Sequence, residues 1–180
     1  MYSVWLKAVP TSSLHRLASA LIEEHAAQLQ TPRFVPHVTL LGGFSAEDDA
    51  SALRATRALA ATLRSEHLRP VCRMNQVQQG PLYYQCVNIL MEDSEHLCRA
   101  HAHARLAFNA PTPSSSFMPH MSIVYGELDA QSKAACAARV ASAFAGLPPG
   151  EAEFTADELA LWRTPHGETE TWSEIALVPL

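Results

Sequence analysis

Two copies of one short pattern, nearly half a chain apart, constrain the fold more than any other feature of this sequence. Residues 36–41 read PHVTLL and residues 119–124 read PHMSIV, so a histidine and a hydroxyl residue recur two positions apart among apolar residues. Alternate side chains of a strand face opposite ways, which places His37 with Thr39 and His120 with Ser122. The pattern predicts two strands, each with one face in a core and one face lining a cleft.

Further strand and helix patterns surround the two motifs. Strands are expected at residues 2–9, 68–79, 82–91, 152–164 and 169–180, and helices at 11–29, 45–67, 93–108 and 129–146. Ser12 or Ser13 can cap the first helix. Gly80-Pro81 and the PHGE stretch at 165–168 suggest two hairpins, and the Pro/Ser-rich residues 110–116 a loop.

The repeat indicates an internal duplication and therefore a two-part architecture. We expect an α+β fold in which residues 1–180 form a single bilobal domain of two intertwined lobes. Two pseudo-twofold-related antiparallel or mixed β-sheets should face a central cleft, with the helices on the outside.

Composition narrows the classes of partner. The chain has 180 residues, 48% of them hydrophobic, and a formal net charge of −5. These values suit an ordinary globular core but not a strong positive field for long nucleic acid or an acidic membrane. The N-terminal MYSVWLKAVP has neither a basic leader nor a sustained apolar run. We expect a cytoplasmic monomer that binds a small molecule.

The paired histidines and hydroxyls suit phosphoester cleavage. Because imidazole titrates near about pH 6.5, one histidine can accept a proton from attacking water while the other, with a raised pKa, donates a proton to the departing alkoxide. Thr39 and Ser122 can donate hydrogen bonds to the phosphoryl oxygens as charge grows there. This scheme needs no metal or cofactor, and the residues alone leave open which histidine is acid and which is base.

A structural role is the alternative for such motifs. A single HxT in a strand is more often a hydrogen-bonded structural histidine. Two facing copies without a function would bury two imidazoles and two hydroxyls at a desolvation cost, which favours catalysis.

The cysteines give no sign of a zinc site or a disulfide framework. Cys72, Cys86, Cys98 and Cys136 lack CxxC spacing, so we expect reduced thiols. In HLCRAHAH, the possible metal ligands are His96, Cys98, His101 and His103. On a helix, residues 96 and 103 share a face while 98 and 101 point elsewhere, which favours a solvated helix face over a metal site.

The sequence resembles the two-histidine (2H) phosphoesterase superfamily, in particular its plant-type cyclic phosphodiesterases. Beyond the paired H-x-[ST] motifs, the resemblance rests on YSVW, PRFVPHVT, YYQCV, MPHMSIVYGEL and ETWSEIAL, which span nearly the whole chain. It implies a bilobal fold with His37, Thr39, His120 and Ser122 in the cleft. It also implies metal-independent hydrolysis of ADP-ribose 1'',2''-cyclic phosphate, a tRNA-splicing by-product, to ADP-ribose 1''-phosphate, and of nucleoside 2',3'-cyclic phosphates to nucleoside 2'-phosphates.

The resemblance further implies aromatic side chains around the nucleotide. Trp5, Tyr84 and Tyr125 stand where such relatives place aromatic groups, and a planar ring can stack on a base. Ordinary core packing is the alternative for each. Tyr125 has the wrong parity for the cleft face of a flat strand, so a bulge or the strand end must turn it inward. The matching position in the first motif is Gly42, so the site cannot be fully symmetric.

Three other functions compete with this prediction. A related enzyme could act on RNA ends that carry a 2',3'-cyclic phosphate or an oligonucleotide tail, which would favour basic residues near the cleft, such as Arg33, Arg69 and Arg73. A non-catalytic nucleotide-binding module would tolerate loss of a motif residue, yet all four are present. A metal-dependent hydrolase using His96, His101 and His103 would be inhibited by chelators.

Overall fold

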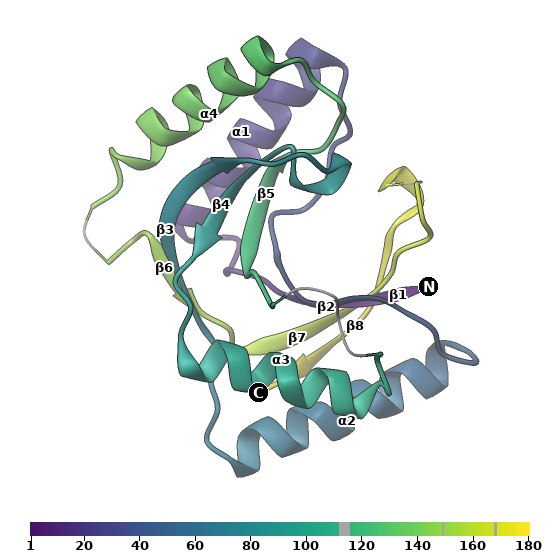
Figure 1. Cartoon of the computed structure of the whole chain (residues 1–180). Helices are drawn as coiled ribbons and strands as arrows, with labels where there is room; N and C mark the ends of the chain where they lie inside the picture. Colours follow the sequence, from purple (N-terminus) through teal and green to yellow (C-terminus); the bar gives the residue numbers. More distant parts are fainter. Residues whose placement is uncertain (112–115, 149, 168) are drawn as a thin grey trace.

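A curled antiparallel sheet forms the centre of the molecule (Figure 1). The computed structural model describes residues 1–111, 116–148, 150–167 and 169–180. Within these residues eight strands pair in the order β6-β3-β4-β5-β2-β1-β7-β8, and all neighbours are antiparallel. The strands are β1 (Tyr2–Leu6), β2 (Val38–Phe44), β3 (Val71–Gln79), β4 (Val87–Met91), β5 (His120–Val124), β6 (Glu153–Thr155), β7 (Glu158–Arg163) and β8 (Ser173–Pro179).

The two motif strands lie next to each other in the middle of this sheet. β2 and β5 are joined through the pair Val38 and Met121. The α+β class is confirmed, but the two expected sheets are instead two four-stranded halves of one sheet, β6-β3-β4-β5 and β2-β1-β7-β8. The reason is that both motif strands reach the centre, where their apolar faces enter a common core.

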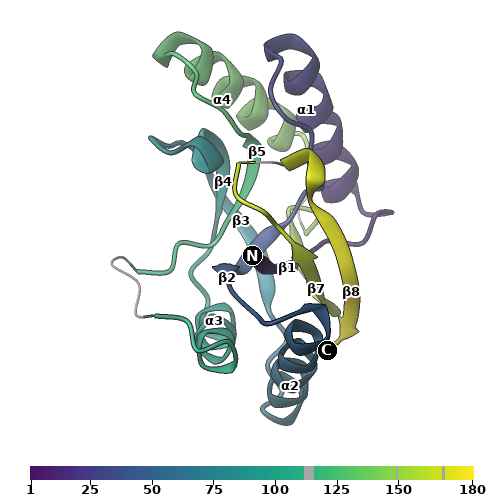
Figure 2. The same ribbon diagram turned by 90° about the vertical axis from the view of Figure 1, so that its right-hand side faces the viewer.

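In the described part of the chain, four α-helices cover the sheet in two pairs (Figures 1 and 2). They are α1 (Ser13–Leu29), α2 (Asp49–Ser65), α3 (Glu95–Ala107) and α4 (Ala130–Phe144). α1 and α4 pack together against the β3-β4-β5 half, whereas α2 packs with α3 and against β7 and β8. After β1, the chain therefore crosses from the β2-β1-β7-β8 half of the sheet to the other half, because α1 packs on β5. Among the described residues, no helix is long and apolar enough to cross a membrane.

Short polar side chains fix where the helices begin. Ser12, Asp48, Ser94 and Asp129 each accept a hydrogen bond from the backbone N–H three residues later, at the start of α1, α2, α3 and α4. Such caps satisfy N–H groups that have no partner inside the helix. The prediction that Ser12 or Ser13 caps the first helix is confirmed for Ser12.

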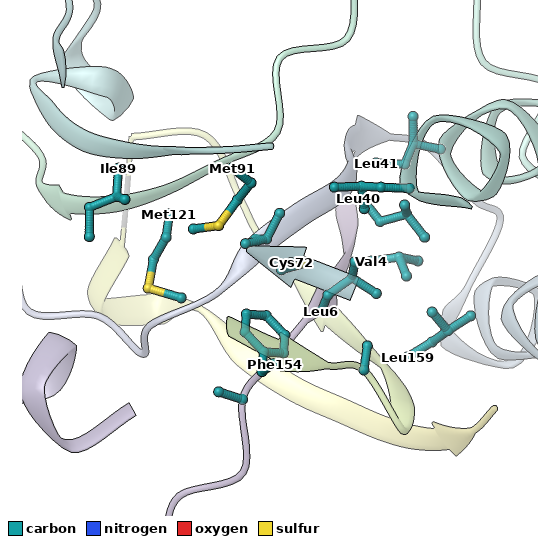
Figure 3. Close-up of a cluster of buried hydrophobic side chains, with 14 of the residues drawn as sticks. Val4, Leu6, Leu40, Leu41, Cys72, Ile89, Met91, Met121, Phe154 and Leu159 are labelled. Carbon is teal, nitrogen blue, oxygen red and sulfur yellow. The ribbon is translucent and has the colours of Figure 1, made fainter. Parts of the chain in front are cut away.

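One hydrophobic core runs through both halves of the sheet (Figure 3). Val4 and Leu40 contribute from β1 and β2, while Ile89 and Met121 contribute from β4 and β5, and all four are fully buried. Burial of such side chains stabilises a fold by about 1.5–3 kcal/mol each relative to exposure. The shared core holds the two motif strands in a fixed relation to one another.

Three of the expected strands have a different form in the structure. The strand expected at 152–164 breaks at Ala156–Asp157, so that β6 pairs with β3 at one edge of the sheet and β7 pairs with β1 in the other half. The start of the strand expected at 82–91 is a 3₁₀ turn, η1 (Tyr83–Gln85). A second such turn, η2 (Thr169–Thr171), precedes β8. In residues 152–164, the acidic Asp157 interrupts the apolar pattern. In residues 82–91, Pro81 and the turn take the place of strand hydrogen bonding at the start of the segment.

Both predicted hairpins are confirmed by the pairing of β3 with β4 and of β7 with β8. Of the PHGE stretch, Glu168 lies outside the described residues. Residues 112–115 of the loop predicted at 110–116 also lie outside the described residues.

Gly80 allows the β3–β4 turn to close tightly. A Cβ atom at Gly80 would lie 2.3 Å from the backbone oxygen of Gln85. Gly80→Ala should therefore lower the free energy of unfolding by about 1–3 kcal/mol, because backbone must move to accommodate the methyl group. Urea denaturation measures this loss. The matched control is Gly146→Ala, whose Cβ would meet Ala143 O at 3.4 Å, an ordinary contact. Equal losses in both variants would contradict the steric argument.

Candidate active site

A cleft of about 350 Å³ opens between the two halves of the sheet. Each residue singled out in the sequence as catalytic or substrate-binding lines it: His37, Thr39, His120, Ser122, Trp5, Tyr84 and Tyr125. The alternation of side chains predicted that the polar faces of the two motif strands would line a cleft, and this is confirmed. These faces meet in one cavity, while Val38 and Met121 enter the core. Tyr125 follows directly after the end of β5 at Val124, as its position relative to His120 required.

The two histidines are held in the same way. Nδ1 of His37 lies 2.6 Å from the carbonyl oxygen of Val35, and Nδ1 of His120 lies 2.8 Å from that of Met118. In each motif the partner is the carbonyl two residues before the histidine. Because a carbonyl only accepts hydrogen bonds, Nδ1 carries the proton in both rings and Nε2 is left as the nitrogen for proton transfer.

The two hydroxyls differ in their partners. The Ser122 hydroxyl donates to the backbone carbonyl of Tyr84 at 2.8 Å. The Thr39 hydroxyl makes no hydrogen bond to another described residue. Thr39 can therefore donate directly to a ligand, whereas Ser122 must first give up its bond to Tyr84.

Burial favours the neutral form of both imidazoles. The pKa of His37 is lowered from 6.5 to about 3, mainly by burial, with smaller contributions from nearby His120 and Lys7, and the hydrogen bond to Val35 acts in the opposite direction. Burial also lowers the pKa of His120. The expectation that one histidine has a raised pKa is contradicted, because burial lowers the pKa of both. A protonated histidine needs a counter-charge, and an anionic phosphodiester would supply one.

Trp5 lies against His37 rather than facing open space. Its ring is stacked on the imidazole with centroids 3.6 Å apart and an angle of 11°, and it is also stacked on Trp162 at 4.4 Å. Only 2% of Trp5 is exposed.

Tyr84 and Tyr125 form part of an aromatic wall. Tyr125 is stacked on Phe34 at 3.8 Å and meets the ring of Tyr84 edge-on at 5.2 Å. The Tyr84 hydroxyl accepts a hydrogen bond from the backbone N–H of Gly167 at 3.0 Å. Tyr84 thus connects the β3–β4 turn to the β7–β8 loop, one from each half of the sheet.

The structure adds cleft residues that sequence reasoning did not assign to the site. They include Gln85, Thr164, His166 and Trp172. Trp172 falls within the ETWSEIAL stretch, so the family resemblance could have indicated it. His166 belongs to PHGE, which was interpreted only as a turn. No local pattern distinguishes it, because the β7–β8 pairing brings it to the cleft.

The histidine-rich stretch on α3 does not form a common ligand set. His101 Nδ1 binds the Leu40 carbonyl oxygen at 2.7 Å and its ring stacks on Phe117, so it does not lie on a solvated face as expected. His103 pairs with Glu66, Cys98 donates to Asp93, and His96 is exposed. Among the described residues no three His, Cys, Asp or Glu side chains are grouped as a metal site requires. All four cysteines are free thiols.

Sequence comparison places both motifs within a known family. A profile of the 2'-5' RNA ligase superfamily matches residues 30–168, which contain His37 and His120. The chain belongs to this superfamily. Its members are two-histidine phosphoesterases, so the predicted family and the prediction of an enzyme are confirmed.

Individual proteins also match over nearly the whole chain. The cyclic phosphodiesterase of Arabidopsis thaliana is 29% identical over 191 residues, covering 100% of this chain and 95% of the relative. The apo crystal structure of E. coli LigT superimposes with a TM-score of 0.58 at 12% identity, covering 99% of this chain and 95% of LigT. The structure of Usb1 from Kluyveromyces marxianus superimposes with a TM-score of 0.50 at 10% identity, covering 99% of this chain and 97% of Usb1. At such identities the two structures establish the fold alone.

The buried His37 should make stability depend on pH. Between pH 6.5 and about 3 the unfolded chain binds a proton at this residue that the folded chain does not, so stability falls as pH falls through this range. From pH 7.5 to 5 the loss attributable to His37 should be about 2 kcal/mol. Urea denaturation at both pH values should show a smaller loss for His37→Gln than for the unmodified chain. The exposed His96→Gln serves as the control, and an equal loss in all three proteins would contradict the assignment.

Proposed function

We propose that the chain hydrolyses small cyclic phosphodiesters without a metal ion. The substrates are nucleoside 2',3'-cyclic phosphates, converted to nucleoside 2'-phosphates, and ADP-ribose 1'',2''-cyclic phosphate, converted to ADP-ribose 1''-phosphate. The observation that carries the proposal is the matched pair of histidines in one cleft, each with Nδ1 on a carbonyl and Nε2 free. The full-length similarity to a protein named cyclic phosphodiesterase supports the choice of substrate class.

Both proton transfers can be carried out by the two imidazoles. The neutral one accepts a proton from water as the water oxygen bonds to phosphorus. The protonated one gives its proton to the ribose oxygen as the bond from that oxygen to phosphorus breaks. The ring opens to a phosphomonoester and a free hydroxyl, and the two histidines have exchanged protonation states. General acid and general base catalysis each contribute about 10²- to 10⁴-fold.

Hydroxyl groups can stabilise the charge that develops on the phosphoryl oxygens. Thr39 is free to donate, and Ser122 can exchange the Tyr84 carbonyl for a phosphoryl oxygen. A lost donor of this kind costs about 10²- to 10³-fold in rate. The bound phosphate has a second effect, because its negative charge raises the pKa of the nearby imidazoles and makes a protonated acid available.

The aromatic wall can hold the sugar and base. Tyr84 and Trp172 line the cleft and are only partly buried, and the centroids of their rings are 5.9 Å apart. A planar face of this kind accepts any base, because every base has a π-face. We therefore expect little discrimination among the four nucleosides.

Hydrolysis in excess EDTA tests the proposal. The substrates are ADP-ribose 1'',2''-cyclic phosphate and the four nucleoside 2',3'-cyclic phosphates. Turnover should persist in EDTA and fall by about 10²- to 10⁴-fold in His37→Ala and in His120→Ala, because each variant lacks one proton-transfer group. His96→Ala, which removes an exposed histidine of α3, should keep full activity. A chain that turns over none of the five substrates would contradict the proposal.

An adjoining cavity favours a second candidate function, the trimming of oligonucleotide tails. It measures about 860 Å³ and shares Thr39, Gly42, Gln85 and His120 with the cleft. A phosphate at these shared residues could carry one nucleoside into each cavity, as in a linear diester. The described lining of both cavities contains no Lys or Arg.

The three arginines considered earlier for RNA binding are exposed and engaged elsewhere. Arg33, Arg69 and Arg73 pair with Glu23, Asp157 and Glu153, respectively. The second candidate is therefore limited to a short end of RNA, since nothing in the two cavities would bind successive phosphates.

Substitution in the second cavity separates the two candidate functions. Asn75 lines this cavity on β3 and is exposed. If dinucleoside monophosphates are substrates, Asn75→Trp should raise their KM about tenfold or more by occupying the space of one nucleoside. KM for the cyclic mononucleotides should stay unchanged, and Asn75→Ala should leave both unchanged. Steady-state kinetics on 2'-5' and 3'-5' dinucleotides gives the comparison, and an equal effect on both substrate classes would exclude a separate nucleoside site.

A further inference from the structure

Trp5 has aromatic groups on both faces of its ring. His37 and Trp162 are each stacked on it, with interplanar angles of 11° and 25°. Two rings on the same face at 3.6 and 4.4 Å would contact one another. No contact between His37 and Trp162 is present, although both residues are described, so they lie on opposite faces. What Trp5 contributes to the cleft is therefore the edge of its ring.

We propose that Trp5 is a positioning residue for His37 and not a stacking platform for the base of the substrate. This inference rests on the proposed function, in which His37 transfers a proton. Stacking fixes the plane of the imidazole, and the hydrogen bond from Nδ1 to Val35 fixes its rotation within that plane. The two contacts together define where Nε2 points. Misplacement of a reacting group by about 1 Å can cost about 10²-fold in rate, so this restraint matters for catalysis.

The stack continues behind Trp5 to a charged group. Lys7 Nζ lies 5.6 Å from the centre of the Trp162 ring and also pairs with Glu174 on β8. Lys7 thus contacts Trp162 through a cation–π interaction while its charge is paired with Glu174. These contacts form a series from His37 through Trp5 and Trp162 to Lys7 and Glu174. The series connects β2 through β1 and β7 to β8.

The surroundings of His37 show what removal of Trp5 would change. Several titratable groups face its ring or line the cleft with it: His120 from β5, Lys7 after β1, Tyr84 from η1, Tyr125 after β5, His166 from the β7–β8 loop and the amino group of Met1. No carboxylate lines the described part of the cleft. Burial is the main cause of the lowered His37 pKa, and the indole covers one face of the imidazole. Water admitted at that face would therefore raise the pKa.

The test compares two substitutions of Trp5 with a matched loss of an aromatic ring elsewhere. Trp5→Phe keeps a flat ring against His37, and Trp5→Leu keeps an apolar side chain without one. Phe44→Leu is the control, because Phe44 is buried at the end of β2, packs on Tyr2 and Phe108, and does not line the cleft. Two measurements are made on each protein: steady-state kinetics with a nucleoside 2',3'-cyclic phosphate, and titration of the His37 ring by NMR.

Trp5→Leu should lower kcat about 10- to 100-fold, with KM changed less than about threefold, and should raise the His37 pKa. Trp5→Phe should recover most of kcat, and Phe44→Leu should change neither kcat nor the titration. A raised KM with unchanged kcat would show that Trp5 binds substrate and would overturn the inference. An unchanged His37 titration in Trp5→Leu would overturn it as well. The titration needs no substrate, so it decides the role of Trp5 even if the chain hydrolyses no cyclic phosphate.

Discussion

The contact between β2 and β5 brings two distant parts of the chain to one cleft. Val38 and Met121 pair at the centre of the sheet, and each is flanked by a histidine whose side chain faces the other way. Because strand side chains alternate, the packing of Val38 and Met121 in the core directs His37 and His120 into the cleft. The core thus sets the geometry of the two histidines. The helices and the outer strands stabilise that one central contact.

Burial of the two imidazoles has a cost that the surrounding structure offsets. A polar group removed from water must regain its hydrogen bonds, and each Nδ1 does so through a carbonyl only two residues away. This local solution needs no other element of the fold, which is why it occurs identically in both motifs. It also leaves Nε2 of either ring without a hydrogen-bond partner among the residues that the structure describes. The arrangement retains a reactive nitrogen at the cleft while meeting the demands of a stable core.

Features encoded by local patterns could be predicted from the sequence. Period-two alternation placed His37 with Thr39 and His120 with Ser122, and the parity of Tyr125 correctly required the strand to end before it. The helices and both hairpins follow from caps, apolar stripes and turn residues. Pairings over long distances in sequence could not be predicted in this way. The division of residues 152–164 between opposite parts of the sheet depends on which strands have free edges.

The same limit applies to the candidate site. Trp5 was correctly expected at the cleft, but its sequence context does not show that His37 and Trp162 cover its two faces. Nor does it show that sheet pairing carries His166 and Trp172 to the same place. The pKa of a histidine depends on its three-dimensional burial, so the sequence could not show that both imidazoles favour the neutral form.

Two equivalent motifs can have opposite proton-transfer roles only if their surroundings differ. The backbone restraints on His37 and His120 match, but their neighbours do not: Trp5 covers one face of His37, and Tyr125 and Gly42 occupy corresponding positions after the two motifs. The hydroxyls differ too, since Ser122 is bound to the Tyr84 carbonyl. The repeated motif provides two matching imidazoles, and the differences around them favour the neutral state of one more than of the other. Stacking on Trp5 makes His37 the more fully buried of the two, so within the proposed mechanism the asymmetry of the site lies in the aromatic residues rather than in the motifs themselves.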